Sequence, residues 1–234
     1  MTLRIVILAG EPEYDSHQTL APIATLLSEK LDAHVDLLIP DIIDDEPDFP
    51  ESSFDNIDAI DNADLLIVYT RFRVLPDDQM RSIQKYLDSK RPVIGLRTST
   101  HAFHFPDSSA WASWNAGFGR DILGSPWISH HGHSSRTRVT VDDSAPSELI
   151  HGLPDAFTVR SWLYVTDPQP WCRPILEGSP INPETDSHPG LVAWYGKPDN
   201  RKTFYTSLGH PDDLLETPVQ TLLLNAASWA VSTA

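Results

Sequence analysis

Four short aliphatic runs are spaced along the first hundred residues, and polar or helix-like segments separate them. The runs are "RIVILA" at residues 4–9, "HVDLLIP" at 34–40, "ADLLIVYT" at 63–70 and "RPVIGL" at 91–96. Strands of a parallel sheet are covered on both faces, so they form almost uninterrupted apolar runs rather than alternating ones. This pattern predicts a doubly wound α/β fold that binds ligands beyond the carboxyl ends of its strands.

Helical spacing between these runs supports the same interpretation. Apolar residues recur at three- and four-residue intervals from Leu20 to Leu31 and again over residues 76–90, where Pro76 and two acids suit a helix start. A capping box at residues 217–220 predicts a C-terminal helix. Further strands are expected at residues 136–142, 157–165, 191–196 and 202–209. No repeat or linker divides the chain, so residues 1–234 are expected to form a single domain.

The charge of the chain narrows the choice of partner. A formal net charge of −16 argues against a nucleic acid or an anionic membrane, because both require clustered Lys and Arg. Much of the acidity lies between Asp41 and Asp61, which is expected to be a solvated loop. This run lacks the EF-hand spacing of a calcium site. Whether the chain forms a homo-oligomer stays open.

Two further features bear on the compartment. A single cysteine, Cys172, excludes an intramolecular disulfide and a cysteine-based zinc site. The apolar run from Ile5 to Ala9 is too short for a signal peptide, and no run approaches the ~20 residues of a membrane span. The expected location is therefore the cytoplasm.

Histidines gather in three segments: "THAFHF" at residues 100–105, "WISHHGH" at 127–133 and "SLGHPDD" at 207–213. His101 and His104 would share one face of a helix. In an extended chain His131 and His133 would point the same way, with His130 facing away. Such residues can bind a metal, transfer protons, bind a sugar or serve the structure alone.

The first two of these roles place the histidines at a chemical site. Imidazoles joined by a carboxylate are a common shell for zinc, manganese or iron. The candidate metal ligands are His101, His131, His133 and His210, with Asp212 or Asp213 supplying the carboxylate. No metal signature such as H-E-x-x-H is present, so no cofactor is certain and a divalent metal such as zinc is the one candidate.

The junction after the fourth predicted strand carries the run Arg97, Thr98, Ser99 and Thr100. In several α/β enzymes this junction holds a glycine-flanked nucleophile, but no G-x-S-x-G pattern occurs here. Ser99 as a nucleophile competes with a cap or turn role for the whole run. Exposed amides there, together with Arg97, would suit an anion or a polarised carbonyl oxygen.

Several segments together resemble the trehalose-utilisation (ThuA-like) family. They are "VIGLRTSTHAFHFP", "DILGSPWISHHG", "HGLPDAF", "LVAW" and "KTFYTSLGHPDDL", followed by "LLLNAASWAV", in order from Val93 to the C-terminal end. The resemblance implies a flavodoxin-like three-layer α/β/α sandwich with a mostly parallel central sheet, related to class I glutamine amidotransferases. It also implies a role in sugar catabolism, with oxidised (3-keto) disaccharides or glycosides as substrates.

Glutaminase activity is disfavoured by one departure. Glutamine amidotransferases need a cysteine thiolate at the junction after the corresponding strand, and this chain has Arg97 and Thr98 there. Within the resembling family a histidine is often expected near the strand end. Arg97 fills that position here, and His101 follows one turn later.

The sequence therefore predicts an enzyme of sugar catabolism that uses histidine acid/base chemistry on an oxidised sugar. The alternative is a non-catalytic sugar-binding or scaffolding protein of the same fold. The candidate catalytic residues are His131, His101, His210 and Asp213. The candidate substrate-binding residues are Arg97, Thr98, Ser99, His104, Trp127, His133 and Asp212.

Overall fold

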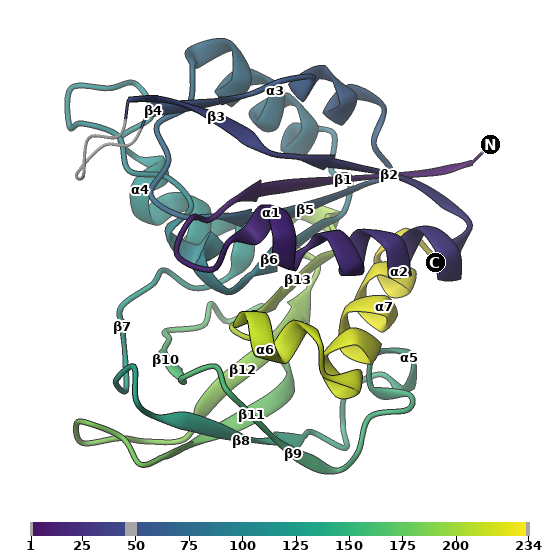
Figure 1. Ribbon diagram of the computed structural model, residues 1–234, viewed down its shortest axis with the longest axis vertical. Coiled ribbons are helices and arrows are strands. Elements are labelled where there is room, and N and C mark those ends of the chain that lie inside the picture. Colours follow the sequence, from purple (N-terminus) through teal and green to yellow (C-terminus); the bar gives the residue numbers. More distant parts are fainter. Residues whose placement is uncertain (1, 45–50, 233–234) are drawn as a thin grey trace.

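A nine-stranded sheet organises the computed structural model, which describes residues 2–44 and 51–232 (Figure 1). The strands lie in the order β2-β1-β5-β6-β13-β12-β11-β8-β9. They are β1 (Leu3–Gly10), β2 (Ala33–Leu38), β5 (Leu65–Thr70), β6 (Val93–Leu96), β8 (Arg136–Val141), β9 (Ala156–Val159), β11 (Arg173–Ile181), β12 (Gly190–Gly196) and β13 (Thr203–Thr206). Two further sheets have two antiparallel strands each: β3 (Pro40–Asp44) pairs with β4 (Glu51–Phe54), and β7 (Ser129–His130) pairs with β10 (Tyr164–Val165).

The predicted α/β class is confirmed by the pairing of these strands. Strands β2, β1, β5, β6 and β13 are parallel neighbours, and the remaining pairs are antiparallel. Following the pairs across the sheet, β12 and β8 run against the other seven strands, so the sheet is mostly parallel. The aliphatic runs of the first hundred residues form the parallel part, as their continuous burial predicts.

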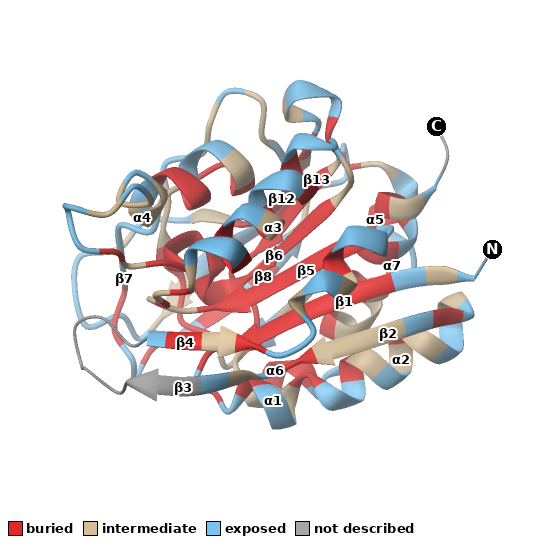
Figure 2. Ribbon diagram, turned by 90° about the horizontal axis from the view of Figure 1, so that it is seen from above, coloured by how far each residue is buried: buried red, intermediate tan, exposed pale blue. Residues whose placement is uncertain are grey.

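Helices cover both faces of the sheet and give two separate cores. Ile5 and Ile7 of β1 face one core, while Val6 and Leu8 face the other, because successive side chains of a strand alternate. Figure 2 shows β1 and β5 buried along most of their length, whereas the edge strand β2 is mostly half-buried.

The first core packs against helices α2 (Ala21–Leu31) and α7 (Thr217–Val231), and the second against α3 (Asp77–Asp88). The shorter helical segments are α1 (Ser16–Thr19), η1 (Ile57–Asn62), η2 (Arg97–His101), α4 (Trp114–Gly117), the π-helical η3 (Phe118–Leu123), α5 (Ser147–Ile150), η4 (Pro198–Asn200) and α6 (Pro211–Leu214). No helix among the described residues is long and apolar enough to cross a membrane.

Strand order also locates the site. The chain leaves β1 toward β2 on one side, whereas β5 lies on the other side of β1. In open α/β sheets ligands bind beyond the carboxyl ends of the strands at such a switch point. The loops after β1, β5 and β6 meet at this edge.

The predicted strand over residues 157–165 is wrong in its middle. The chain forms β9 and then, after a break at residues 160–163, the short strand β10. The carboxylate of Asp213 accepts hydrogen bonds from the backbone amides of Arg160 (2.6 Å) and Ser161 (3.0 Å). Because these two amides donate to a side chain, they do not donate to a neighbouring strand, and the strand is interrupted there.

Two smaller predictions also need correction. Within the acidic run, residues 40–44 and 51–54 form the β3–β4 hairpin and residues 57–62 form η1, so it is not a plain loop; residues 45–50 lie outside the described part. The capping box is not formed, because Glu216 is the N-cap of α7 and makes no side-chain capping bond. The Gln220 amide instead donates to the backbone oxygen of Leu214 (3.0 Å).

Candidate active site

A cleft of about 250 Å³ lies at the carboxyl edge of the parallel strands. The loops after β1, β5 and β6 supply Glu13, Tyr14, Arg71, Phe72, Thr98 and His101. The segments around β7 and β10 supply Trp127, His130, His133, Trp162 and Tyr164. The cleft therefore joins the first half of the chain to the histidine segment, at the place where the strand order predicts a ligand.

The turn after β6 has the backbone of a nucleophile elbow but carries an arginine. Arg97 has a left-handed φ of 40° directly after the strand, a conformation that non-glycine residues rarely adopt. The Tyr205 hydroxyl holds this turn by donating to the Arg97 carbonyl oxygen (2.6 Å). Gly209 packs against it, since a Cβ at Gly209 would lie 3.1 Å from the Arg97 Cβ.

Cys172 does not take the place of the missing nucleophile. Its thiol lies 3.5 Å from the Gly124 carbonyl oxygen, outside the residues that line the cleft. Burial raises the pKa of the Cys172 thiol to about 12, so the reactive thiolate is not formed near neutral pH. The described residues therefore offer no cysteine nucleophile at the elbow.

The Arg97 side chain lies behind the cleft rather than in it, contrary to its predicted contact with substrate. Its guanidinium donates to the Ser207 carbonyl oxygen (2.8 Å) and to the Tyr14 hydroxyl (3.1 Å). It also lies 4.5 Å from the ring centroid of Trp162 and 4.9 Å from that of Tyr164. Because these rings line the cleft, the arginine supports the aromatic wall from the inside.

Arg97 nevertheless acts on the cleft through its charge. It is fully buried, and none of the ion pairs in the described ranges includes it. Burial is the main cause that lowers the pKa values of His101, His130 and His210, and the positive charge of Arg97 lowers each of them further. Burial and, to a smaller extent, this cation therefore favour the neutral form of the neighbouring imidazoles.

The predicted orientation of the histidines in "WISHHGH" is reversed. His130 and His133 both line the cleft, with ring centroids 4.4 Å apart, whereas His131 is buried away from it. His130 pairs with Tyr164 in the two-stranded β7–β10 sheet, and Gly132 then turns the chain with a φ of 98°. The prediction assumed an extended chain through Gly132, and this left-handed turn breaks the two-residue alternation.

Hydrogen bonds select the tautomer of His130. The Gly132 amide donates to His130 Nδ1 (3.1 Å), so the neutral ring carries its proton on Nε2. His210 is held the same way, because the Asp212 amide donates to its Nδ1 (3.2 Å). Burial, followed by the charges of His133 and Arg97, lowers the pKa of His130. His130 is therefore a neutral hydrogen-bond donor toward a ligand.

His101 forms part of the cleft floor and is a poor base. Its ring packs against Phe72 (4.8 Å between centroids) and Trp127 (5.0 Å). Burial, and then the charges of Arg71 and Arg97, lowers the pKa of His101 to about 3. A group with so low a pKa holds a proton weakly at neutral pH, which makes it inefficient as a general base.

Replacing His101 with glutamine should remove one source of acid destabilisation. The folded protein binds a proton at His101 only near pH 3, whereas the ordinary value is 6.5. Between these values the unfolded chain binds a proton that the folded one does not, so this stabilisation is complete above pH 6.5 and falls as the pH drops. From pH 6.5 to about pH 5 the loss is about 2 kcal/mol.

The measurement compares the free energies of unfolding of wild-type protein and His101→Gln in urea at about pH 7.5 and about pH 5. Burial raises the pKa of Glu11 to about 7, which has the opposite sign: its stabilisation falls as the pH rises from 4.5. Glu11 is present in both proteins and cancels from the comparison. An identical pH dependence of the two proteins would contradict the role given to His101.

The other predicted substrate-binding residues are divided by the structure. Thr98 and Trp127 line the cleft, and Trp127 is 37% exposed. Ser99 is buried with no hydrogen-bond partner for its hydroxyl, and it does not reach the cleft. His104 lies beside the Phe72 ring, 5.6 Å between centroids, but outside the cleft lining.

The "SLGHPDD" segment supports the site from behind. His210 packs on Tyr14 (5.8 Å between centroids) and Trp162 (6.1 Å), and does not line the cleft. Asp212 points to solvent, with its side chain 71% exposed and 3.6 Å from His210 Nδ1. Asp213 is buried and bonded to two backbone amides, so its predicted catalytic role is replaced by a structural one.

The predicted metal ligands do not converge. Within residues 2–44 and 51–232 no group of three or more His, Cys, Asp or Glu side chains has the geometry to hold a metal ion. His131 faces away from the cleft that His101 and His133 line. The residues present therefore do not fit the predicted divalent metal.

Sequence reasoning missed most of the aromatic wall and the acidic residues beside it. Trp162 and Tyr164 are two residues apart in a strand-like segment, and this spacing was the signal that they share a face. Glu11 follows β1 at the switch point and is buried 3.9 Å from Arg71. The Tyr14 amide donates to its carboxylate (2.6 Å). Only the tertiary structure brings these residues together.

The helix-flanked, mostly parallel sheet gives this protein a glutamine amidotransferase-like α/β fold. The elbow after β6 carries Arg97 in place of a cysteine. The chain belongs to the trehalose utilisation (ThuA) family, whose model matches residues 4–230. A ThuA-like protein from Bacteroides uniformis has a TM-score of 0.68 at 16% identity, with 98% of this chain and 91% of that chain covered. One from Parabacteroides merdae has a TM-score of 0.65 at 14% identity, with 99% and 91% covered.

A more distant likeness is to Agd3, described as a carbohydrate deacetylase. Its TM-score is 0.57 at 13% identity, with 98% of this chain but only 32% of that chain covered. At such low sequence identities, these likenesses establish a shared fold and nothing more. No curated protein matches the sequence.

Proposed function

We propose that this protein is an enzyme of sugar catabolism that acts on an oxidised (3-keto) disaccharide or glycoside by histidine acid/base chemistry. The observation that carries the proposal is the pair of His130 and His133, whose rings are in contact and face a tryptophan-walled cleft at the switch point of the sheet. Membership of the trehalose utilisation family supports a sugar-related role. The carbohydrate deacetylase among the structural neighbours is consistent with that role.

The cleft wall suits a sugar ring. Trp127 and Trp162 both line it, and the C–H face of a sugar packs well on an aromatic surface. The Trp162 ring also contacts His133 (4.6 Å between centroids) and His130 (5.8 Å). Trp162 is 6% exposed, so Trp127, at 37%, offers the accessible aromatic face, and a sugar ring in the cleft would lie beside both histidines.

The two histidines have different roles in the proposed reaction. The ketone at C3 of the sugar acidifies the C2–H bond, and His133 accepts that proton as general base. The electron pair moves to the ketone oxygen, and His130 Nε2–H donates a hydrogen bond to the resulting enolate. The enolate then expels the C1 substituent, forming a C1–C2 double bond, and protonated His133 returns the proton to the leaving oxygen.

Charge in the surrounding protein favours the enolate. Arg97 is a buried cation directly behind the aromatic wall, and Arg71 lies at the rim. A fixed positive charge in a low-dielectric region stabilises developing negative charge without having to reorganise. Arg71 is partly neutralised by Glu13 at 3.5 Å, so Arg97 is the larger contributor.

The proposal is tested by incubating the purified protein with a 3-keto disaccharide and, separately, with the parent disaccharide. We expect the C1 substituent to be released from the 3-keto disaccharide but not from the parent disaccharide, because the parent has no ketone to acidify its C2–H bond. Binding of the ketone without conversion would favour the non-catalytic sugar-binding alternative. Ammonia release from glutamine, measured in parallel, would contradict the conclusion that the turn after β6 does not support glutaminase activity.

The divalent metal is tested separately. Elemental analysis of the purified protein, before and after chelation, measures any bound ion directly. The proposed steps use no metal, so turnover should persist after chelation.

A further inference from the structure

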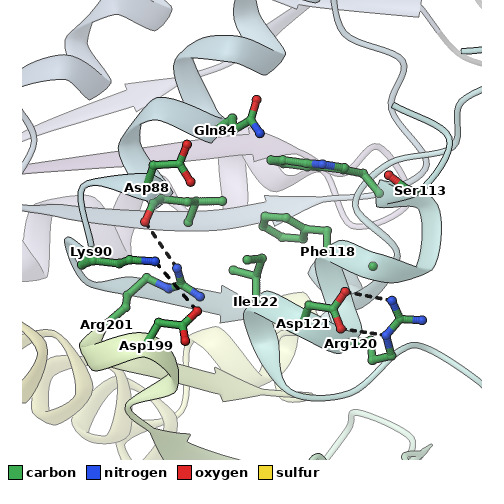
Figure 3. A pocket seen from close by; sticks show the side chains of 13 residues that line it. Gln84, Asp88, Lys90, Ser113, Phe118, Arg120, Asp121, Ile122, Asp199 and Arg201 are labelled. Carbon is green, nitrogen blue, oxygen red and sulfur yellow. Dashed lines mark hydrogen bonds and ion pairs between the residues drawn. The ribbon is translucent and has the colours of Figure 1, made fainter. Parts of the chain in front are cut away.

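A second cavity, of about 330 Å³, lies at the opposite edge of the sheet from the cleft, where β6 and β13 begin. The end of α3, the segment α4–η3 and the residues before β13 enclose it (Figure 3). Trp114, Phe118 and Ile122 form an apolar wall, with the Trp114 and Phe118 rings stacked 5.8 Å apart. The proposed reaction uses none of these residues.

Arg201 lines this cavity as a buried cation with no carboxylate of the described residues within ion-pair distance. The residue is 3% exposed, and its Nη1 donates to the Leu87 carbonyl oxygen at 3.3 Å. Its Nε has no hydrogen-bond partner, and none of the ion pairs in the described part of the chain includes it. Burial lowers the pKa of Arg201, and the charges of Asp199 and Asp88 offset only part of that effect. An unpaired buried charge is unfavourable, and an anionic ligand would relieve it.

Charges at the rim of the cavity cancel in pairs. Arg120 contacts Asp121 at 2.7 Å, and Lys90 lies 3.8 Å from Asp199 (Figure 3). Asp88 adds one further carboxylate at the rim. Together with Arg201, the lining holds three cations and three carboxylates, so it is formally neutral before a ligand binds. A monoanion paired with Arg201 leaves one excess negative charge, whereas a dianion such as phosphate leaves two and is repelled more strongly by the three carboxylates.

We propose that this cavity binds the carboxylate group of a small organic acid. Arg201 pairs with the carboxylate, and the ring or apolar part of the acid packs on Trp114, Phe118 and Ile122. Planar guanidinium and carboxylate groups match each other in shape and hydrogen-bonding pattern. The proposal is independent of the sugar chemistry, because the cavity and the cleft share no residue.

Benzoate, its neutral isostere benzamide and inorganic phosphate are suitable probes. Benzoate should raise the melting temperature of the full chain and change its tryptophan fluorescence, because Trp114 lines the cavity. Benzamide should bind about tenfold more weakly or worse, since it lacks the charge. Phosphate should have no effect at the same concentration. A failure of benzoate to bind, or equal effects of all three probes, would overturn the proposal.

Two variants locate the binding site. Arg201→Gln keeps an amide that can reach the Leu87 carbonyl oxygen but removes the charge, and should weaken benzoate at least about tenfold. Arg91→Gln is the matched control, because Arg91 donates to the Ala63 carbonyl oxygen (2.7 Å) outside the cavity and should bind benzoate as the wild type does. Benzoate binding that survives Arg201→Gln would contradict the assignment.

A third variant tests the site without touching Arg201. Gly117 lines the cavity in a helical conformation, and a Cβ there would meet no heavy atom closer than 3.5 Å. Gly117→Leu should therefore fold and fill the cavity, abolishing the benzoate effect. An unchanged response in this variant would place any binding elsewhere, even if Arg201→Gln proved unstable.

Discussion

Replacing His133 with glutamine should lower kcat/KM on a 3-keto disaccharide by about 100- to 10,000-fold. That range is the usual contribution of a positioned general base, and glutamine retains the size and polarity of the ring but cannot accept the C2 proton. His133 lines the cleft and its ring contacts that of His130, whose own Nδ1 is occupied by the Gly132 amide. His133 is thus the histidine with the best geometry for the base.

His131→Gln is the matched control, since it changes a neighbouring histidine that faces away from the cleft. Its kcat/KM should stay within about threefold of the wild type, which corresponds to less than one kcal/mol. Steady-state kinetics on both variants, with thermal denaturation to confirm folding, makes the comparison. If His131→Gln loses activity and His133→Gln keeps it, the orientation of this segment in the proposed mechanism is wrong.

Replacing Gly119 with alanine should destabilise the fold by about 3 kcal/mol. A Cβ at this position would collide with the Thr100 carbonyl oxygen and would lie 2.9 Å from the Ser125 carbonyl oxygen. Both obstacles are backbone atoms, so no side chain can rotate away. Overpacking of a rigid region costs about 1–3 kcal/mol, and the upper end applies where the backbone itself must move.

Gly117→Ala provides the control two residues away. Its new Cβ would meet Asp121 Oδ2 at 3.5 Å, an ordinary contact, and alanine is about 1 kcal/mol more favourable than glycine within a helix. Urea denaturation of both variants measures the two free energies of unfolding. A similar, small change in both would show that η3 can move away from the elbow segment η2 without loss of stability.

The fold was predictable because buried strands have apolar residues at consecutive positions, and this pattern is visible in the sequence. A strand covered on both faces is apolar at nearly every position, so the runs ending at Ala9, Thr70 and Leu96 predicted the parallel part of the sheet. The position of the site followed from the same rule, since the carboxyl ends of parallel strands meet at one edge. Thr98, His101, Trp127 and His133 line the cleft at that edge.

The sequence pattern did not predict which way individual side chains point or which residues they contact. A left-handed turn at Gly132 exchanges the roles of His130 and His131, and a carboxylate 52 residues away in sequence interrupts the strand at Ser161. The sequence by itself determined the α/β sheet and the edge that carries the cleft. The tertiary structure alone decided which histidines face the cleft and that Arg97 lies behind its wall. Periodicity reflects the burial of each residue, whereas a site depends on contacts between segments that are distant in the chain.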